Sequence, residues 1–254
     1  MRMALERPSR RTTLALLFAS GLSLLVGRAV DAFGPLRADG SDRWPADDTV
    51  SLPAPREQSD ISVEDAIASR RSQRTYDDRP LNRGELGQLC WATQGVTDPT
   101  DGHRAAPSAG ALYPLELYVV LGSPGVEGFD PGVYRYRPEG HELGGGRSGD
   151  RRSELREATL GQEFVDDAPV DIVICGVDER TTGTYGERGR QRFVPMEAGH
   201  AGENLALQAE ALGLATVSVG AFDDDRIREV LEAPSTQRPL YIFPVGTRAG
   251  ATEE

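Results

Sequence analysis

The sequence predicts one folded domain that mixes helices and strands and begins near residue 61. From there onward, apolar residues follow helical and strand spacing in turn. Residues 170–177 form a nearly continuous apolar run, as expected for a strand covered on both faces. Residues 195–212 carry the longest helical pattern, and their alanines and glycines allow close packing against another element. The 254 residues are sufficient for one such domain with a tail.

Two helix starts in the first half of the domain carry capping residues. Ser62, which is followed by acidic residues, is predicted to cap a short helix over 62–69. Asn82 stands three residues before Glu85, the spacing of a capping box, and Gly95 marks the end of this second helix. The remaining pattern predicts strands at 115–121, 133–136, 142–143, 215–219 and 240–245, and a helix at 224–231.

The N-terminal segment has the layout of an export signal. A pair of arginines at 10–11 precedes an uncharged apolar run at 14–26, which is short for a membrane span. Residues 1–33 are therefore predicted to be a twin-arginine-like signal peptide or membrane anchor, with membrane association through residues 10–30. A plain helix of a cytoplasmic protein is the alternative. Residues 34–60 are rich in Pro, Asp and Ser and are predicted to be a linker.

The composition restricts the partners. Forty acidic residues against twenty-eight basic ones give a net charge of -12. This charge argues against nucleic acid, because the phosphates would be repelled. The chain contains no lysine, and an acidic, lysine-free chain suits a high-salt cytoplasm where self-repulsion is screened. Codon bias alone is the alternative explanation.

The cysteines and histidines do not indicate a metal site. Cys90 and Cys175 each lie in an apolar pattern and are predicted to be core residues without a disulfide. His103, His141 and His200 lack the spacing of metal ligands, and no carboxylate is expected to accompany them.

Residues 70–76, RRSQRTY, form a dense cluster of cations just after the first predicted helix. Arg70, Arg71 and Arg74 present guanidinium groups that match phosphate oxygens, and Ser72 adds a hydroxyl. A solvated basic turn is the alternative reading of such a cluster.

A small, flexible turn follows about thirty residues later, in the segment 107–118, PSAGALYPLELY. Pro107, Ser108, Ala109 and Gly110 would allow backbone N–H groups to approach a flat or anionic ligand closely. Together with the arginine cluster, this turn suggests a phosphorylated planar cofactor.

These residues resemble a known family. The order R-R-S-x-R-x-Y and then P-S-A-G-A-x-Y-P-L-E is similar to that of the nitroreductase-like flavoproteins, specifically the SagB/ThcOx-type dehydrogenase branch. The stretches at 197–225 and 239–248 agree with it, so the resemblance covers roughly 61–248. It implies an α+β fold over 61–254 in which helices flank a central, mostly antiparallel sheet. It also implies a homodimer that holds FMN at its interface and transfers a hydride to or from a small organic substrate.

The resemblance also implies roles for individual residues. The arginine cluster would contact the flavin, the PSAG turn would line it and reach across the dimer, and Arg248 would reach its phosphate. The backbone after the strand at 215–219 would approach the flavin ring, although a simple strand-to-helix turn is an equal alternative. The implied cofactor-binding residues are Arg70, Arg71, Ser72, Arg74, Pro107, Ser108, Ala109, Gly110, Val219, Gly220, Ala221 and Arg248.

One pair of residues departs from the family branch. Members that oxidise azolines carry a Lys-Tyr pair shortly before the E-x-G-H helix, whereas this chain has Thr184 and Tyr185. A threonine hydroxyl is no base near neutral pH, which leaves Tyr185 as the candidate proton-transfer residue. The leading hypothesis is therefore an FMN-dependent oxidoreductase. The alternatives are a peptide azoline dehydrogenase, a non-catalytic flavin-binding protein and a structural domain without cofactor.

Overall fold

The computed structural model describes residues 49–250. The predicted signal or anchor at 1–33 lies outside this range, as does most of the predicted linker. No helix between residues 49 and 250 is long and apolar enough to cross a membrane.

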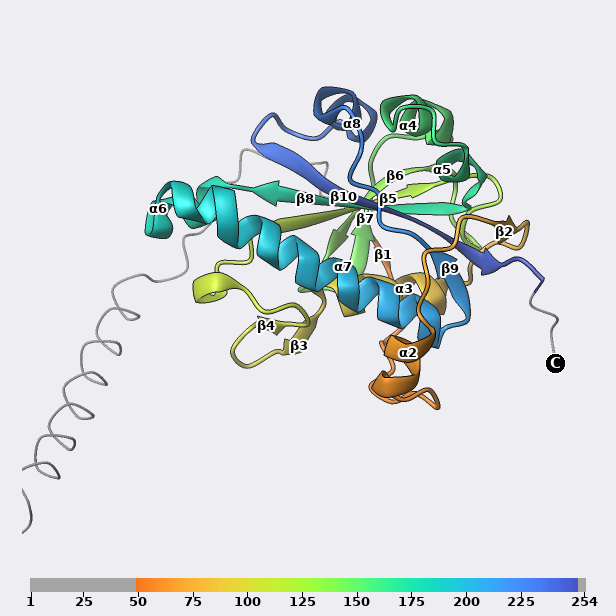
Figure 1. The fold of residues 1–254 in the computed structure, drawn as a ribbon, viewed down its shortest axis with the longest axis horizontal. Coiled ribbons are helices and arrows are strands. Elements are labelled where there is room, and N and C mark those ends of the chain that lie inside the picture. Colours follow the sequence, from red (N-terminus) through yellow and green to blue (C-terminus); the bar gives the residue numbers. More distant parts are fainter. Residues whose placement is uncertain (1–48, 251–254) are drawn as a thin grey trace, which may run out of the picture. The chain divides into compact units, whose positions relative to one another are not determined.

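An antiparallel sheet forms the centre of the described part (Figure 1). Within residues 49–250 it has eight strands in the order β1-β7-β6-β5-β8-β10-β2, with β9 beside β10. Every pairing in it is antiparallel, which confirms the prediction of a central, mostly antiparallel sheet. The strands are β1 (Thr49–Ser51), β2 (Tyr76–Asp77), β5 (Leu115–Leu121), β6 (Gly132–Arg137), β7 (Glu142–Gly144), β8 (Val170–Val177), β9 (Leu214–Thr216) and β10 (Gln237–Arg248), and a separate hairpin consists of β3 (Val96–Asp98) and β4 (His103–Arg104).

Helices cover both faces of this sheet (Figure 1). Helices α3 and α7 lie on one face, and α4, α5 and α8 lie on the other. Helix α2 packs against α7, and α6 leads through the π-helical turn η2 into α7. The bounds are α2 (Val63–Ser69), α3 (Arg83–Gln94), the 3-10 turn η1 (Ala109–Ala111), α4 (Arg152–Ala158), α5 (Glu163–Asp167), α6 (Glu179–Tyr185), η2 (Gly189–Phe193), α7 (Val194–Ala211) and α8 (Asp224–Leu231).

Strand β8 separates two hydrophobic cores. Ile172 and Ile174 belong to the core under α3 and α7, whereas Val173 and Cys175 belong to the core under α4, α5 and α8. Side chains alternate between the faces of a strand, so a strand buried on both faces needs apolar residues at nearly every position. The prediction of a doubly covered strand at 170–177 is confirmed.

The predicted caps are also present. The Ser62 side chain accepts from the N–H of Asp65 at the start of α2. Asn82 and Glu85 form a reciprocal capping box at the start of α3, which ends at Gly95. These local signals are reliable because each satisfies N–H groups that a helix end leaves unpaired.

Other elements differ from the sequence prediction. Strand β1 lies inside the segment predicted to be a linker, 34–60, and pairs with β7, and Leu52 after it is buried. Strand β10 is longer than the predicted 240–245 at both ends. Toward its start, a register shift between Pro239 and Tyr241 lets the pairing continue past a proline, and toward its end it pairs with β9 and β2. Helices α4, α5 and α6 have seven, five and seven residues, too few for a clear periodic pattern.

Gly202 marks the close approach of α7 to β10. A Cβ atom built there would lie 2.7 Å from Cζ of the buried Phe243 ring. We expect Gly202→Ala to lower the free energy of unfolding by about 1 kcal/mol, because the ring must shift within a packed core. Gly199→Ala is the matched control: no atom lies within 4 Å of its Cβ position, and it should be neutral or slightly stabilising. Urea unfolding measures both variants, and equal losses would contradict this packing.

Candidate functional site

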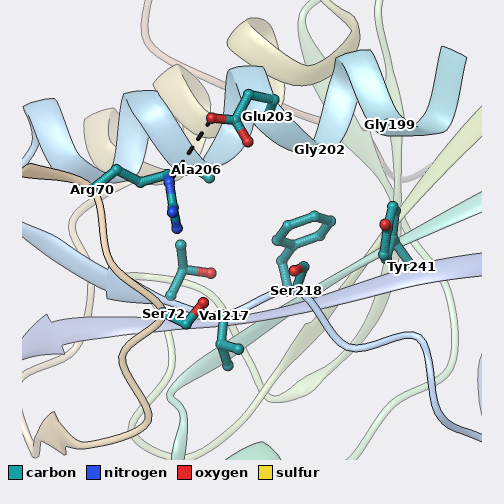
Figure 2. Close-up of a pocket in the computed structure, with 11 residues that line it drawn as sticks. Arg70, Ser72, Gly199, Gly202, Glu203, Ala206, Val217, Ser218 and Tyr241 are labelled. Atoms are coloured by element: carbon teal, nitrogen blue, oxygen red, sulfur yellow. Dashed lines mark ion pairs between the residues drawn. The ribbon is translucent and has the colours of Figure 1, made fainter. Parts of the chain in front are cut away.

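A small cavity lies between α7, the end of α2 and the strands β9 and β10 (Figure 2). Its volume of about 80 Å³ is well below the roughly 300–1,000 Å³ of a pocket that encloses an organic ligand. In this view, α7 forms one wall and the segments after α2 and β9 form the opposite one. The lining residues are Arg70, Ser72, Gly199, Gly202, Glu203, Ala206, Thr216, Val217, Ser218, Tyr241 and Phe243.

Arg70 and Ser72, two of the predicted cofactor-binding residues, line this cavity. Arg70 follows directly after α2, and its Nε lies 3.9 Å from Oε1 of Glu203 on α7 (Figure 2). Ser72 is held in place by its neighbour, because the Gln73 N–H donates to the Thr216 carbonyl of β9 at 2.9 Å. Arg70 is partly exposed, so its guanidinium remains accessible to an anion.

The other two arginines of the cluster lie outside the cavity lining. The Arg71 guanidinium donates to the carbonyl oxygens of Ala68 and Arg70, where it satisfies the end of α2. The Arg74 guanidinium lies over the Phe164 ring of α5, 5.5 Å from its centre. The predicted contacts of Arg71 and Arg74 with a cofactor therefore stay predictions.

Of the three residues predicted to contact a cofactor after β9, one is bonded to the sheet and two lie at the surface. Val219 exchanges both backbone hydrogen bonds with Ile242, at 2.8 and 3.0 Å, so its N–H is committed to β10. The backbone N–H groups of Gly220 and Ala221 donate to no residue within 49–250, and both residues are exposed. In this turn, Gly220 and Ala221 are thus the residues whose N–H groups are free to approach a ligand.

Arg248, at the end of β10, is paired with α7. Its Nη2 donates to Oε2 of Glu210 at 2.7 Å. Helix α7 thus supplies the carboxylates that face two of the predicted arginines, Glu203 for Arg70 and Glu210 for Arg248.

The PSAG turn does not share this cavity. Pro107, Ser108, Ala109 and Gly110 are absent from its lining, and η1 lies at the end of α7 nearest α6 (Figure 1). The two segments that predicted one cofactor therefore lie toward opposite ends of α7 in a single chain.

The backbone of this turn is strained. Gly110 has a φ of 64°, and Ala111 and Tyr113 have φ values of 52° and 43°, which are unusual for residues with a side chain. The turn is fixed by the Ser108 Oγ, which accepts from the N–H of Tyr113 at 2.9 Å. Strain of this kind persists where the surroundings hold the backbone firmly, and it is often found at functional sites.

Tyr185 reaches the same turn from α6. A Cβ atom built on Gly110 would lie 2.7 Å from the Tyr185 hydroxyl, so only glycine leaves room for it. The Tyr185 ring meets Phe193 edge-on, with 4.9 Å between the ring centres. The structure therefore brings Tyr185 and Gly110 together, while Thr184 is exposed on the same helix.

Glu197 is a residue that the sequence analysis did not single out. It lies near the start of α7, it is 2% exposed, and neither carboxylate oxygen has a hydrogen-bond partner of standard geometry within residues 49–250. Burial raises the pKa of this carboxyl to about 7, against smaller opposing effects of Ser108, Arg104 and Arg180. The sequence did hold one signal for its burial. Glu197 lies four residues before the buried Ala201, on the same face of α7, and a charged residue on an apolar helix face is unusual.

One group of potential metal ligands contradicts the expectation that no carboxylate accompanies a histidine. Ligand atoms of Asp98, Asp101 and His103 lie within 4.8 Å of one another around the β3–β4 turn. The turn itself explains this grouping, since Oδ1 of Asp98 accepts from the N–H groups of Thr100 and Asp101.

Comparison with known proteins gives consistent matches. The sequence profile of the nitroreductase family matches residues 67–247. MJ1384 of Methanocaldococcus jannaschii, which carries the provisional name of a nitroreductase, is 43% identical over 201 residues, or 79% of this chain and 98% of MJ1384. The microcin B17-processing protein McbC of Escherichia coli is 28% identical over 149 residues, or 57% of this chain and 54% of McbC.

A solved structure extends the comparison to the fold. A protein of Ralstonia eutropha JMP134, also provisionally named a nitroreductase, superposes with a TM-score of 0.70 and is 29% identical in sequence. The alignment covers 86% of this chain and 96% of that protein. The range matched by the family profile contains all the predicted cofactor-binding residues except Arg248.

Proposed function

Because this chain belongs to the nitroreductase family of oxidoreductases, whose members typically bind FMN, we propose that it is an FMN-dependent oxidoreductase. It would catalyse two-electron transfer, as a hydride, to or from a small organic substrate. The observation that carries the proposal is the meeting of Arg70, Ser72 and the segment that follows β9 around one cavity.

The residues present fit a phosphorylated flavin. Arg70 offers a partly exposed guanidinium for the phosphate, and Ser72 offers a hydroxyl. The unpaired N–H groups of Gly220 and Ala221 suit the polar edge of a ring system. FMN, when bound, supplies the two-electron chemistry, and the protein orients the reactants and tunes the site.

Two copies of the chain would complete the site. A cavity of about 80 Å³ is too small to enclose FMN, and the PSAG turn lies outside it. We infer that the turn of one copy closes the cavity of the other, so that a homodimer carries two equivalent sites. The exposed apolar side chains Ile61, Val63 and Ile67 on and beside α2 support such an interface.

Tyr185 is the proposed proton-transfer residue. Its hydroxyl lies against Gly110 of the turn that would cover the substrate, and Phe193 holds its ring. A phenol held in this way could donate a hydrogen bond or a proton to a substrate oxygen or nitrogen.

Azoline dehydrogenation is the second candidate. The similarity to the microcin B17-processing protein McbC favours it. The exposed Thr184 argues against it, because a threonine hydroxyl does not replace a lysine amine as a base.

The test is an absorption spectrum of the full-length protein purified from an FMN-replete host. We expect flavin bands, bleaching by dithionite under anaerobic conditions, reoxidation by a quinone or nitroarene, and a dimer by light scattering. A folded, colourless protein that does not take up FMN would refute the proposal. Bound FMN that reacts with none of the acceptors would favour a non-catalytic flavin-binding protein, and oxidation of a thiazoline-containing peptide would favour the second candidate.

A further inference from the structure

Three exposed arginines lie close together in and beside the π-helical turn η2. They are Arg188, Arg190 and Arg192. Nε of Arg190 lies 3.4 Å from Oδ2 of Asp178. The guanidinium groups of Arg188 and Arg192 make no hydrogen bond or ion pair within residues 49–250. The chain has forty acidic residues against twenty-eight basic ones, so a shortage of carboxylates does not explain these two unpaired cations.

The π-helical geometry determines where Arg188 lies. The N–H of Val194 donates to the carbonyl of Gly189, five residues earlier. In an α-helix this bond spans four residues, and side chains five residues apart point in clearly different directions. The wider π-helical turn brings such side chains toward the same side. Arg188 and Phe193 are related in this way, and Cζ of Arg188 lies over the Phe193 ring, 5.9 Å from its centre.

Phe193 connects this cation to the PSAG turn. Its ring meets the ring of Tyr185 edge-on, with 4.9 Å between the centres, and the Tyr185 hydroxyl lies against Gly110. A row of contacts thus leads from Arg188 through two aromatic rings to the turn. The N–H donors of a guanidinium lie in its plane, so a group that covers a ring with its face keeps them available for a carboxylate.

The other arginines that contact the turn are already neutralised. Arg104 lies over the Tyr113 ring, 4.9 Å from its centre, and Arg180 donates to the Tyr113 carbonyl at 3.0 Å. Each of these two arginines pairs with a glutamate. Arg188 differs from them, because within residues 49–250 no carboxylate pairs with it.

We propose that Arg188 is an anion-binding residue of the substrate site and that the substrate is a small organic acid. Its guanidinium holds the carboxylate of the substrate, while the Tyr185 hydroxyl reaches the reacting oxygen or nitrogen. A dedicated cation is needed because a protein with a net charge of -12 repels anions as a whole. This inference rests on the proposed function, in which the substrate lies at the PSAG turn.

The test compares two nitroarenes of nearly equal size, the anionic 4-nitrobenzoate and the neutral 4-nitrobenzamide. The full-length, FMN-loaded protein is reduced anaerobically with one equivalent of dithionite. Flavin reoxidation is then measured against the concentration of each acceptor. Both acceptors carry the same reacting group, so a change in the ratio of their second-order rate constants between variants reports on the carboxylate.

We expect Arg188→Gln to lower the benzoate-to-benzamide ratio about 5- to 10-fold, the effect of one hydrogen-bonded ion pair that is partly exposed to water. Arg188→Lys should recover part of the loss, because lysine keeps the charge but lacks the planar fork. Arg226→Gln is the matched control: it removes an exposed arginine from α8, on the other face of the sheet, and should keep the ratio within about 2-fold of wild type. The inference is overturned if Arg188→Gln also stays within this limit.

The phosphate of FMN is the other anion that Arg188 could bind, and the same variant distinguishes the two. We expect Arg188→Gln to change the dissociation constant of FMN less than about 3-fold, below the effect of one hydrogen bond to a charged group. If FMN binding weakens more than about 10-fold while the ratio of rate constants is unchanged, Arg188 serves the cofactor and the inference fails.

A measurement on the flavin-free protein separates this inference from the proposed function. The arginine Nε–H signals, with that of Arg188 assigned from Arg188→Gln, are followed by NMR during titration with each nitroarene. The Arg188 signal should move with 4-nitrobenzoate and stay in place with 4-nitrobenzamide. If it does so but the protein binds no FMN, the proposed function fails while the anion site stands. If it responds equally to both compounds or to neither, and FMN-loaded protein shows no change of the ratio in Arg188→Gln or cannot be formed, the anion site is refuted.

Discussion

Replacing Glu197 with glutamine is expected to raise the free energy of unfolding by about 3 kcal/mol at pH 8 and to leave it nearly unchanged at pH 4. The native carboxyl has a pKa of about 7, against an ordinary value of 4.5. The unfolded chain therefore releases this proton at a lower pH than the folded chain does. Wild-type stability falls between these two values, and a gap of about 2.5 pH units corresponds to about 3 kcal/mol.

The sign of the effect follows from the burial. An acid with a raised native pKa lowers stability above its unfolded pKa, and the full penalty is present above its native pKa. Glutamine keeps the size and hydrogen-bonding capacity of the protonated acid but does not titrate. At pH 4 both side chains are neutral in the folded state, so the two proteins should be equally stable.

Urea unfolding at pH 4, 6 and 8 checks this expectation. Glu187→Gln is the matched control, because that side chain is exposed and its replacement should stay within about 0.5 kcal/mol of wild type. A constant difference between Glu197→Gln and wild type at all three pH values would show that folding does not raise the pKa of the carboxyl.

Replacing Arg70 with alanine is expected to weaken FMN binding about 10- to 100-fold. This guanidinium lines the cavity and is partly exposed, with only a long ion pair to Glu203 at 3.9 Å. A hydrogen bond to a charged group contributes about 1.5–3 kcal/mol, and each 1.4 kcal/mol changes the affinity tenfold. Fold stability should change little, because an exposed ion pair of this length contributes at most about 1 kcal/mol.

Arg71→Ala is the matched control in the same segment. Its guanidinium already donates to the carbonyl oxygens of Ala68 and Arg70, so its loss should affect the end of α2 more than the cavity. We expect FMN affinity to fall less than about 3-fold in this variant, below the effect of one hydrogen bond to a charged group. Fluorescence titration with FMN measures the affinity of both variants. A larger loss of affinity in Arg71→Ala than in Arg70→Ala would show that the phosphate does not bind in the cavity.

The sequence by itself determined most of the local structure, because these signals need only neighbouring residues. Ser62 and the Asn82–Glu85 pair satisfy N–H groups one turn away, so they mark helix starts wherever the chain goes. The apolar run at 170–177 predicted a strand buried on both faces, because the side chains on each of its two faces are apolar. The motifs at 70–76 and 107–118 likewise identified the family.

Only the tertiary structure decided how distant parts meet. Strand β1 has little apolar pattern of its own and forms because β7 offers a free edge at the far side of the sheet. Strand β10 passes Pro239 because a register shift removes the need for its missing N–H. Neither fact can be read from neighbours in the chain.

The candidate site shows the same division between local chemistry and long-range placement. Residue types alone indicated which arginines could bind a phosphate, but packing decided that Arg70 enters the cavity while Arg71 caps α2. Burial raised the pKa of Glu197 to about 7, and the packing of distant segments around this carboxyl is what buries it. The desolvation of a charge depends on everything packed around it, and no local pattern of residues specifies that environment.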